Sequence, residues 1–397
     1  MRVSTSQIFS ASLSQINSSL NEVVRLNQVN SSQKRINAPS DDPSGMARVV
    51  NLRSYDSALA RYADTCSTAD SYLSLADTQL AKASEKITSA LEQVEQASTG
   101  TYTTTQMRQM STELSGYLDA LLSIANSKMG DDYVFGGDEL GSSAFEAGLG
   151  VTVTGEDMAA SDVASVTGEA DTTIAVRFTS DGTVGADSLT YEYSIDGGET
   201  WTGGTLAASS SSLTIGDCQV TLASGASLIA SDGEGGGSSF LVREAIFYTG
   251  GDKAMSVDIS QGVAVDMTSV GSGIFGGVDP DTGQAFSGAN LFENICECIA
   301  YMDQGDSDKV AEYLEKISAA QERLETGAAG VGSRETKIDA VNSSITQIRS
   351  VTSSSISGEE DADLTKVLVD LKQANYVYES VLSSTSNIMQ MSLLDYL

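Results

Sequence analysis

The chain has 397 residues, of which 54 are acidic, 22 are basic and none is histidine, so its formal net charge is −32. This charge argues against nucleic acid and anionic membrane surfaces as partners, because both are bound through Lys and Arg. Without histidine the chain lacks the commonest general base and metal ligand, so we expect no enzyme, no metal site and no cofactor.

The first predicted element is a helix with apolar residues in steps of three and four: Leu13, Ile16, Leu20 and Val23. A helix buries such a stripe against another helix. We expect this helix to end before a joint at residues 37–43, because Pro39 disfavours a helical conformation in the residue before it. Asp42 can cap the next helix, with Pro43 at its first position, where the missing N–H costs nothing.

A second helix is predicted from about Pro43 to Ala97, with a heptad seam that contains neither Gly nor Pro. The seam consists of Leu52, Tyr55, Leu59, Tyr62, Cys66, Ala69, Leu73, Ala76, Leu80, Ala83, Ile87, Ala90, Val94 and Ala97. A turn at residues 100–105 leads to a third helix, whose seam is Met107, Met110, Leu114, Tyr117, Leu121 and Ile124. Together they predict a helical hairpin.

Residues 131–290 differ in composition, with 24 acidic and 3 basic side chains and most of the 37 glycines of the chain. Apolar residues alternate here, as in β-strands joined by Gly-containing turns. The alternating positions are Ile174, Val176 and Phe178, then Leu189, Tyr191, Tyr193 and Ile195, and finally Val220 and Leu222. Tyr191, Tyr193 and Trp201 fit the core of a small sheet better than a glycan-binding face.

Helical periodicity returns near Leu291. It is strong at Val310, Tyr313, Ile317, Ala320 and Leu324, weakens over residues 327–334, and continues at Ile338, Val341, Ile345 and Ile348. Residues 353–360 are expected to form a second joint. The last helix then carries a seam of Leu364, Val367, Leu371, Ala374, Tyr378, Val381, Thr385 and Ile388.

These elements predict a mainly α fold with an inserted β domain. A long antiparallel coiled coil or helical bundle is built from both termini, and a small antiparallel β domain lies at its tip. We divide the chain into a terminal helical segment (1–42 plus 355–397), a helical bundle (43–145 plus 241–354) and an acidic β insert (146–240). The two joints should lie side by side.

The four cysteines are expected to be buried thiols. Cys66 occupies a seam position, where a thiol behaves as a small apolar side chain. Cys296 and Cys298 lie in an apolar helical stretch, and no second cysteine pair completes a zinc site. No apolar signal segment is visible after Met1, and no run of about 18 apolar residues predicts a membrane span.

Residues 31–45, Ser-Ser-Gln-Lys-Arg-Ile-Asn-Ala-Pro-Ser-Asp-Asp-Pro-Ser-Gly, resemble the N-terminal signature of the flagellin superfamily of bacterial axial proteins. The tail Met391–Leu397 and the segments Tyr133–Gly137 and Ile259–Gly262 are similar to the branch of that family that joins the flagellar hook to the filament. The resemblance covers roughly residues 1–140 and 250–397.

This resemblance implies an extracellular structural subunit, exported through the flagellar type III channel with the help of a chaperone. Copies of the chain would form a ring between the first hook-associated protein and flagellin, and their terminal helices would pair fully only on assembly. The implied assembly interface is Leu13, Ile16, Leu20, Val23, Arg35, Ile36, Asn37, Asp41, Asp42, Pro43, Leu371, Tyr378, Val381, Ile388, Leu393, Leu394, Tyr396 and Leu397. The alternatives are a filament flagellin, or a lectin-like or enzymatic β insert on a helical stalk.

Overall fold

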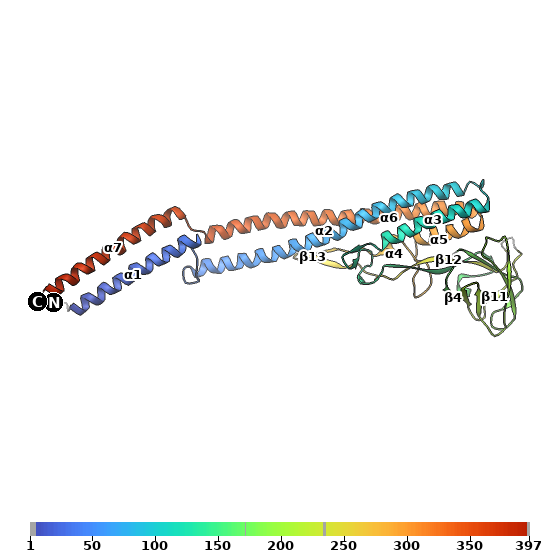
Figure 1. Cartoon of the computed structure of the whole chain (residues 1–397), viewed down its shortest axis with the longest axis horizontal. Helices are drawn as coiled ribbons and strands as arrows, with labels where there is room; N and C mark the ends of the chain where they lie inside the picture. The colour runs from blue at the N-terminus through green and yellow to red at the C-terminus, as the bar shows by residue number, and fades with distance from the viewer. Residues whose placement is uncertain (1–4, 171, 233–235, 395–397) are drawn as a thin grey trace. The chain divides into compact units, whose positions relative to one another are not determined.

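The computed structural model describes residues 5–170, 172–232 and 236–394. The chain forms two compact units, one of Met1–Asp64 with Val341–Leu397 and one of Thr65–Ala340. Long helices come from both ends of the chain, and antiparallel strands lie in its middle, which confirms the predicted fold class (Figure 1). None of the described helices is long and apolar enough to span a membrane.

The helices are α1 (Thr5–Ser32), α2 (Pro43–Ala97), α3 (Thr104–Ala125), α4 (Gly271–Ile274), α5 (Leu291–Gln304), α6 (Ser307–Glu360) and α7 (Leu364–Leu394). The strands are β1 (Lys128–Met129), β2 (Asp132–Tyr133), β3 (Phe145–Val153), β4 (Val163–Gly168), β5 (Ile174–Phe178), β6 (Gly182–Thr183), β7 (Leu189–Ser194), β8 (Thr202–Leu206), β9 (Ser212–Ile215), β10 (Cys218–Leu222), β11 (Ser227–Leu228), β12 (Ser239–Tyr248), β13 (Ser256–Ser260) and β14 (Val263–Asp266).

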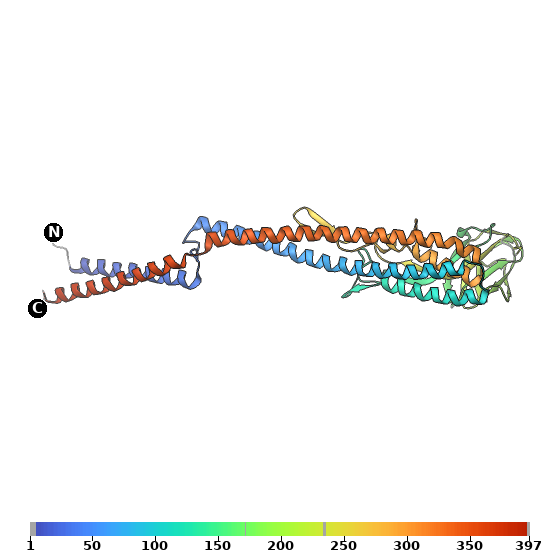
Figure 2. The same ribbon diagram turned by 90° about the horizontal axis from the view of Figure 1, so that it is seen from above.

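The predicted heptad seam of α2 is buried throughout the Thr65–Ala340 unit. Every seam residue from Cys66 to Ala97 is at most 1% exposed. In this unit α2 and α6 lie side by side in both views (Figures 1 and 2), and Gln321 Nε2 donates to Thr88 Oγ1 at 3.2 Å. The buried residues of α6 here are Val310, Tyr313, Ile317, Ala320, Leu324, Val331 and Ile338. The seam predictions are therefore confirmed for this part of both helices.

Several details of the helical predictions were wrong. In α3 the predicted positions Met107, Met110, Leu114 and Leu121 are buried, but Leu118 and Ala125 are buried in place of Tyr117 and Ile124, which are only partly buried. Tyr55 and Ile348 are 49% and 37% exposed, so both lie outside the buried seam. The expected joint at residues 353–360 is helical, because α6 continues to Glu360. The Ser354 and Ser355 hydroxyls donate to the carbonyls four residues earlier, so serine side chains are accommodated within the helix.

The β region contains two main sheets, with strand orders β3-β12-β5-β7-β8 and β4-β10-β9. Side chains of both sheets share one buried cluster, which includes Val176, Phe178, Val220 and Phe240. The predicted strands β5, β7 and β10 are confirmed, although Ile195 is 59% exposed and lies beyond the end of β7.

The β insert is attached to the helices by paired strands. β3 and β12 pair antiparallel over their whole length, from Phe145 opposite Tyr248 to Val153 opposite Phe240. Arg243 of β12 is 3% exposed, and its guanidinium donates to Thr152 Oγ1 at 2.6 Å and to Glu293 of α5. A buried charge is tolerated only when it is paired in this way. The insert is therefore packed firmly onto α5.

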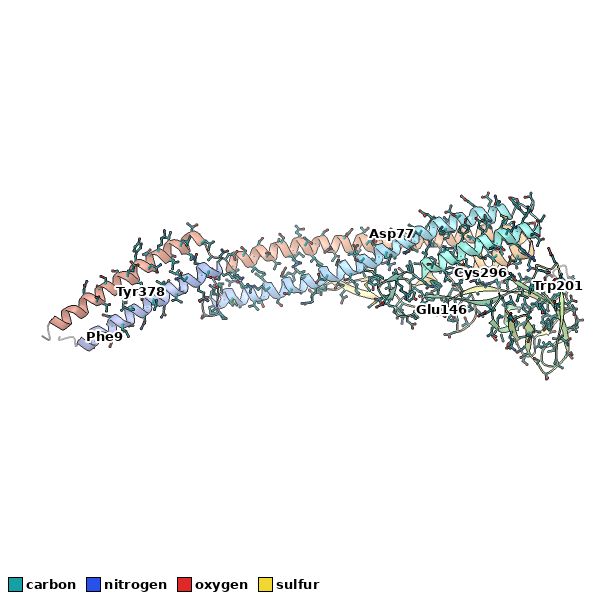
Figure 3. All side chains as sticks on the ribbon, viewed as in Figure 1. Phe9, Asp77, Glu146, Trp201, Cys296 and Tyr378 are labelled. Carbon is teal, nitrogen blue, oxygen red and sulfur yellow. The ribbon has the colours of Figure 1, made fainter. Side chains whose placement is uncertain are left out.

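The aromatic residues of the insert do not form an open face. Tyr191 is 5% exposed and belongs to the core that the two sheets share. The Trp201 ring lies 3.9 Å below the Arg177 guanidinium and packs against a cluster that includes Ala300 of α5. Figure 3 labels Trp201 and Cys296, which both belong to this unit. All four cysteines are free and buried, as predicted.

Candidate assembly site at the helix joint

Two short connecting segments meet within the unit of Met1–Asp64 and Val341–Leu397. Residues 33–42 connect α1 to α2, and residues 361–363 connect α6 to α7; we call the two segments the joint. Arg35 N donates to the Glu360 carbonyl at 2.6 Å, and Ala362 N donates to the Gln33 carbonyl at 3.0 Å. The two segments therefore lie side by side, as expected, but the C-terminal one follows Glu360 instead of preceding it.

Two adjacent aspartates organise the N-terminal segment of the joint. Asp41 Oδ2 accepts hydrogen bonds from the backbone N–H groups of Asn37 and Ala38, at 2.9 and 2.8 Å. Asp42 Oδ1 accepts one from Gly45 N in the first turn of α2, at 2.9 Å. These backbone donors hold the pKa of both carboxyl groups below the usual range. The prediction that Asp42 caps α2 is confirmed.

The last two residues of α6 form ion pairs with the N-terminal half of the same unit. The Glu360 side chain, which is 8% exposed, lies 2.7 Å from Lys34 Nζ and 2.5 Å from an Arg53 nitrogen. Glu359 accepts two hydrogen bonds from Arg48, at 3.0 and 2.9 Å. Burial raises the pKa of Glu360, but hydrogen bonds from Lys34 and Arg53 outweigh burial and lower it overall.

Close packing completes the joint. Ile36 is 3% exposed and Val49 is 1% exposed. A Cβ atom at Gly45 would lie 2.5 Å from Asp42 Oδ2 and 2.7 Å from Ile36 Cδ1. Arg35 reaches across the joint, since its guanidinium donates to the Glu359 carbonyl at 2.8 Å. The joint is thus a packed structure in which a Cβ atom at Gly45 would force the Asp42 or Ile36 side chain to shift.

The helices that extend from the joint, α1 and α7, lie along one another (Figures 1 and 2). The side of α7 with reduced exposure follows the predicted seam at Val367, Leu371, Ala374, Tyr378, Val381 and Thr385. Leu364, which was also predicted to lie in the seam, is 38% exposed. Among the described side chains of α1, those with reduced exposure are Ser12, Ile16, Ser19, Val23, Leu26, Val29, Asn30 and Ser32. Four of these eight are serine or asparagine, so the pair buries few large apolar side chains.

The predicted stripe of α1 is divided between two faces. Ile16 and Val23 are partly buried, whereas Leu13 and Leu20 are 49% and 39% exposed. Within a single copy of the chain, the helix pair therefore covers only Ile16 and Val23 of the predicted stripe. Among the described side chains of the pair, the large apolar ones that are exposed are Phe9, Leu13, Leu20 and Val24 on α1, and Leu364, Leu368, Val369, Tyr376, Val377 and Leu382 on α7. Figure 3 labels Phe9 and Tyr378 on these helices.

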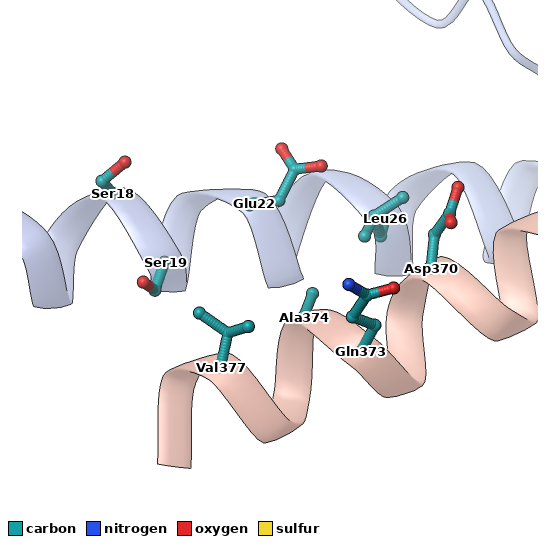
Figure 4. Close-up of a pocket in the computed structure, with 8 residues that line it drawn as sticks. All are labelled: Ser18, Ser19, Glu22, Leu26, Asp370, Gln373, Ala374 and Val377. Atoms are coloured by element: carbon teal, nitrogen blue, oxygen red, sulfur yellow. The ribbon is translucent and has the colours of Figure 1, made fainter. Parts of the chain in front are cut away.

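A shallow groove of about 400 Å³ runs between α1 and α7. Leu26 and Ser19 of α1 extend toward α7, where Ala374 and Val377 face them, whereas Glu22 points away (Figure 4). The groove is open and its lining is mixed, so it does not resemble the enclosed apolar pockets that hold small molecules. Within the described residues, no group of three potential His, Cys, Asp or Glu ligands could hold a metal ion.

Some predicted interface residues lie beyond what the structure describes. The side chains of Ile388, Leu393 and Leu394, and the whole of Tyr396 and Leu397, fall outside the described part of the chain. Conversely, the sequence analysis missed Glu359, Glu360 and their cationic partners. The signal that could have found them is the acidic pair Glu359–Glu360, within the segment expected to lie beside Lys34 and Arg35.

Comparison with known proteins identifies the family. Residues 3–136 match the bacterial flagellin N-terminal helical region, and residues 314–397 match the bacterial flagellin C-terminal helical region. Together these two regions include more than half of the chain and both sides of the joint. The chain belongs to the flagellin family.

Two relatives of this flagellin-family chain are flagellar hook-associated protein 3 of Salmonella typhimurium and of Escherichia coli. The first is 30% identical over 151 residues, which are 38% of this chain and 48% of the relative. The second is 28% identical over 158 residues, which are 40% of this chain and 50% of the relative. The match thus spans about half the length of each relative.

A solved structure from Vibrio parahaemolyticus, described as a flagellar hook-associated protein, has a similar fold. Its TM-score is 0.50 at 15% identity, and the match covers 81% of this chain and 100% of that one. At this identity the likeness supports the fold alone.

Proposed function

We propose that the chain is a structural, non-enzymatic subunit of the bacterial flagellum that forms the junction between hook and filament. Membership of the flagellin family and the two relatives named flagellar hook-associated protein 3 support this proposal. The observation that carries it is the apolar outer surface of the α1–α7 pair, on which Leu13, Leu20 and Val24 are at least 39% exposed. An exposed row of apolar residues on a helix pair is costly in water and favours burial against another chain.

The charge distribution favours other copies of the chain as the covering partner. α1 carries one acidic and one basic residue, Glu22 and Arg25, and α7 carries two of each. Both helices therefore have no net charge, although the whole chain has a net charge of −32. Neutral helices can pack closely without repulsion, whereas strongly acidic surfaces keep neighbouring bodies apart. Copies would thus associate through α1 and α7.

Assembly then couples folding to binding. The serine positions of α1 leave the isolated pair with a thin apolar interface, and isolated helices are marginal in water. Contacts with neighbouring copies would supply the missing burial and order both helices. The joint would set the direction in which α1 and α7 leave α2 and α6. The division into a terminal segment (1–42 plus 355–397), a bundle and a β insert is part of this proposal.

The proposed role also implies where the subunit would act. The subunits would form a ring outside the cell, between the first hook-associated protein and flagellin, after type III export with a chaperone. The terminal segment would contact neighbouring copies through Arg35, Asn37, Asp41 and Asp42. The same contacts would involve residues of the tail, namely Leu393, Leu394, Tyr396 and Leu397.

A deletion strain tests the assignment. A junction subunit predicts that its loss leaves hooks in place while flagellin protein accumulates in the medium, and that the wild-type gene restores filaments. A filament flagellin instead predicts bare hooks with no other flagellin in the medium. Hooks that still carry filaments after the deletion would refute the junction proposal.

A further inference from the structure

Three glycines lie within six residues of the continuous helix α6: Gly327, Gly330 and Gly332. Glycine is among the least favourable residues in a helix, because it loses the most backbone freedom and leaves the backbone exposed. A glycine inside a helix therefore usually has a packing or backbone reason.

Only one of the three glycines has a packing reason in this structure. A Cβ atom at Gly327 would lie 3.1 Å from Ile274 Cγ1, so the glycine allows α4 to approach closely. A Cβ atom at Gly330 or Gly332 would meet no other atom within 4 Å. Neither residue has a positive φ. Alanine would therefore fit at both positions, and the glycines weaken the helix without a compensating contact within the subunit.

Two arginines hold the glycine segment from both sides. Before it, Arg323 donates to the carbonyls of Gly273 and Ala289, at 2.8 and 2.9 Å. After it, Arg334 donates to the Thr268 carbonyl at 2.9 Å. Both arginines thus bind the backbone of one region, residues 268–289.

Arg334 also forms a hydrogen bond with the glycine segment itself. Its Nε donates to the carbonyl of Gly330 at 3.3 Å, so this carbonyl, which belongs to the helix ladder, has a side-chain donor as well. If the backbone hydrogen bond to this oxygen lengthens, the Arg334 side chain can still donate a hydrogen bond to it. Val331, between the two open glycines, is fully buried, which keeps the segment attached to the core.

We propose that residues 327–332 form a compliant turn of α6, which opens locally while residues 268–289 act as a splint through Arg323 and Arg334. Local openings of this kind have lower free energies than global unfolding. Gly/Ser pairs are among the common causes of sharp helix kinks, and Gly332 is followed by Ser333. The inference concerns the isolated subunit and does not depend on the proposed function.

Amide hydrogen exchange of the full-length subunit tests the proposal. We expect amides of residues 328–334 to exchange at least tenfold faster than those of residues 314–322 in the same helix. The double variant G330A/G332A should slow exchange at 328–334 by about tenfold or more and leave residues 314–322 unchanged. The opposite variant, A329G, adds a glycine at an exposed position and should accelerate exchange there. Arg334→Gln should accelerate exchange at both 328–334 and 266–269.

Uniform protection along α6, or no effect of G330A/G332A on exchange, would overturn the proposal. Circular dichroism verifies that each variant is folded. If G330A/G332A leaves exchange unchanged but prevents assembly, the glycines instead make room for a neighbouring chain, and the compliant turn is refuted.

Discussion

Arg53 of α2 donates from one guanidinium nitrogen to both carboxylate oxygens of Glu360, the last residue of α6, at 2.7 and 2.5 Å. Lys34, from the segment that follows α1, lies 2.7 Å from the same carboxylate. One largely buried side chain therefore ties three parts of the unit together. α7 begins four residues after this contact.

Removing the charge of Glu360 should destabilise the joint. Glu360→Gln keeps the size of the side chain but leaves Lys34 and Arg53 without their counter-charge, at a cost of about 1–2 kcal/mol. Chemical denaturation and amide exchange at residues 33–38 measure this loss. Glu359→Gln is the matched control, because the Glu359 side chain is 31% exposed, and screened surface pairs contribute little. Equal effects of the two variants would contradict the special role of Glu360.

The same contact predicts a dependence on pH. The pKa of Glu360 is lowered from 4.5 in the folded chain, so its ion pairs contribute fully above that value. Their contribution is lost as the pH falls from 4.5 through the lower folded pKa. The difference in unfolding free energy between wild type and Glu360→Gln should therefore be constant near neutral pH and shrink in acid. Denaturation series at several pH values test this, and a difference that grows in acid would be inconsistent with the lowered pKa.

The packing around Gly45 predicts a sharp response to a single methyl group. Gly45→Ala places a Cβ atom 2.5 Å from Asp42 Oδ2, so the cap of α2 must shift, at a cost of about 1–3 kcal/mol. Gly116→Ala in α3 is the control, since nothing lies within 4 Å of its Cβ position. That substitution should stabilise the helix by about 0.5–1 kcal/mol. Thermal unfolding should show a lower melting temperature for Gly45→Ala and a higher one for Gly116→Ala. A higher melting temperature for Gly45→Ala would mean that the joint is not tightly packed.

The two faces of α1 should respond differently to substitution. Leu20 is 39% exposed, so Leu20→Lys should change the stability of the isolated subunit by less than about 0.5 kcal/mol but prevent assembly. Leu26 is 5% exposed within the helix pair, so Leu26→Ala should destabilise the pair itself by about 2 kcal/mol. Complementation of a deletion strain, together with circular dichroism of the purified variants, separates the two effects. Normal filaments with Leu20→Lys would argue against an assembly role for this face.

The features that sequence reasoning predicted are those set by neighbouring residues. The seam from Cys66 to Ala97 follows from a regular heptad repeat, and the cap by Asp42 follows from a residue and the helix turn next to it. The strands β5 and β7 follow from alternation within six residues. In each case the determining contacts are close in sequence or repeat regularly.

The missed features depend on distant partners. Glu360 and Arg53 are 307 positions apart, and no local pattern pairs them. The sequence also did not show which apolar residues of α1 face α7. Leu13, Ile16, Leu20 and Val23 all follow one helical spacing, and only the position of α7 decides which of them are covered. The continuation of α6 to Glu360 overrides the weak helix propensity of its serines.

The central claim is that neighbouring copies cover the outer face of the α1–α7 pair in a single ring at the hook–filament junction. A cryo-electron microscopy reconstruction of that junction tests it most directly. We expect one layer of this chain between hook and filament, with Leu13, Leu20 and Val24 buried against neighbouring subunits. A chain that is distributed along the filament, or a layer in which these residues remain exposed, would contradict the claim.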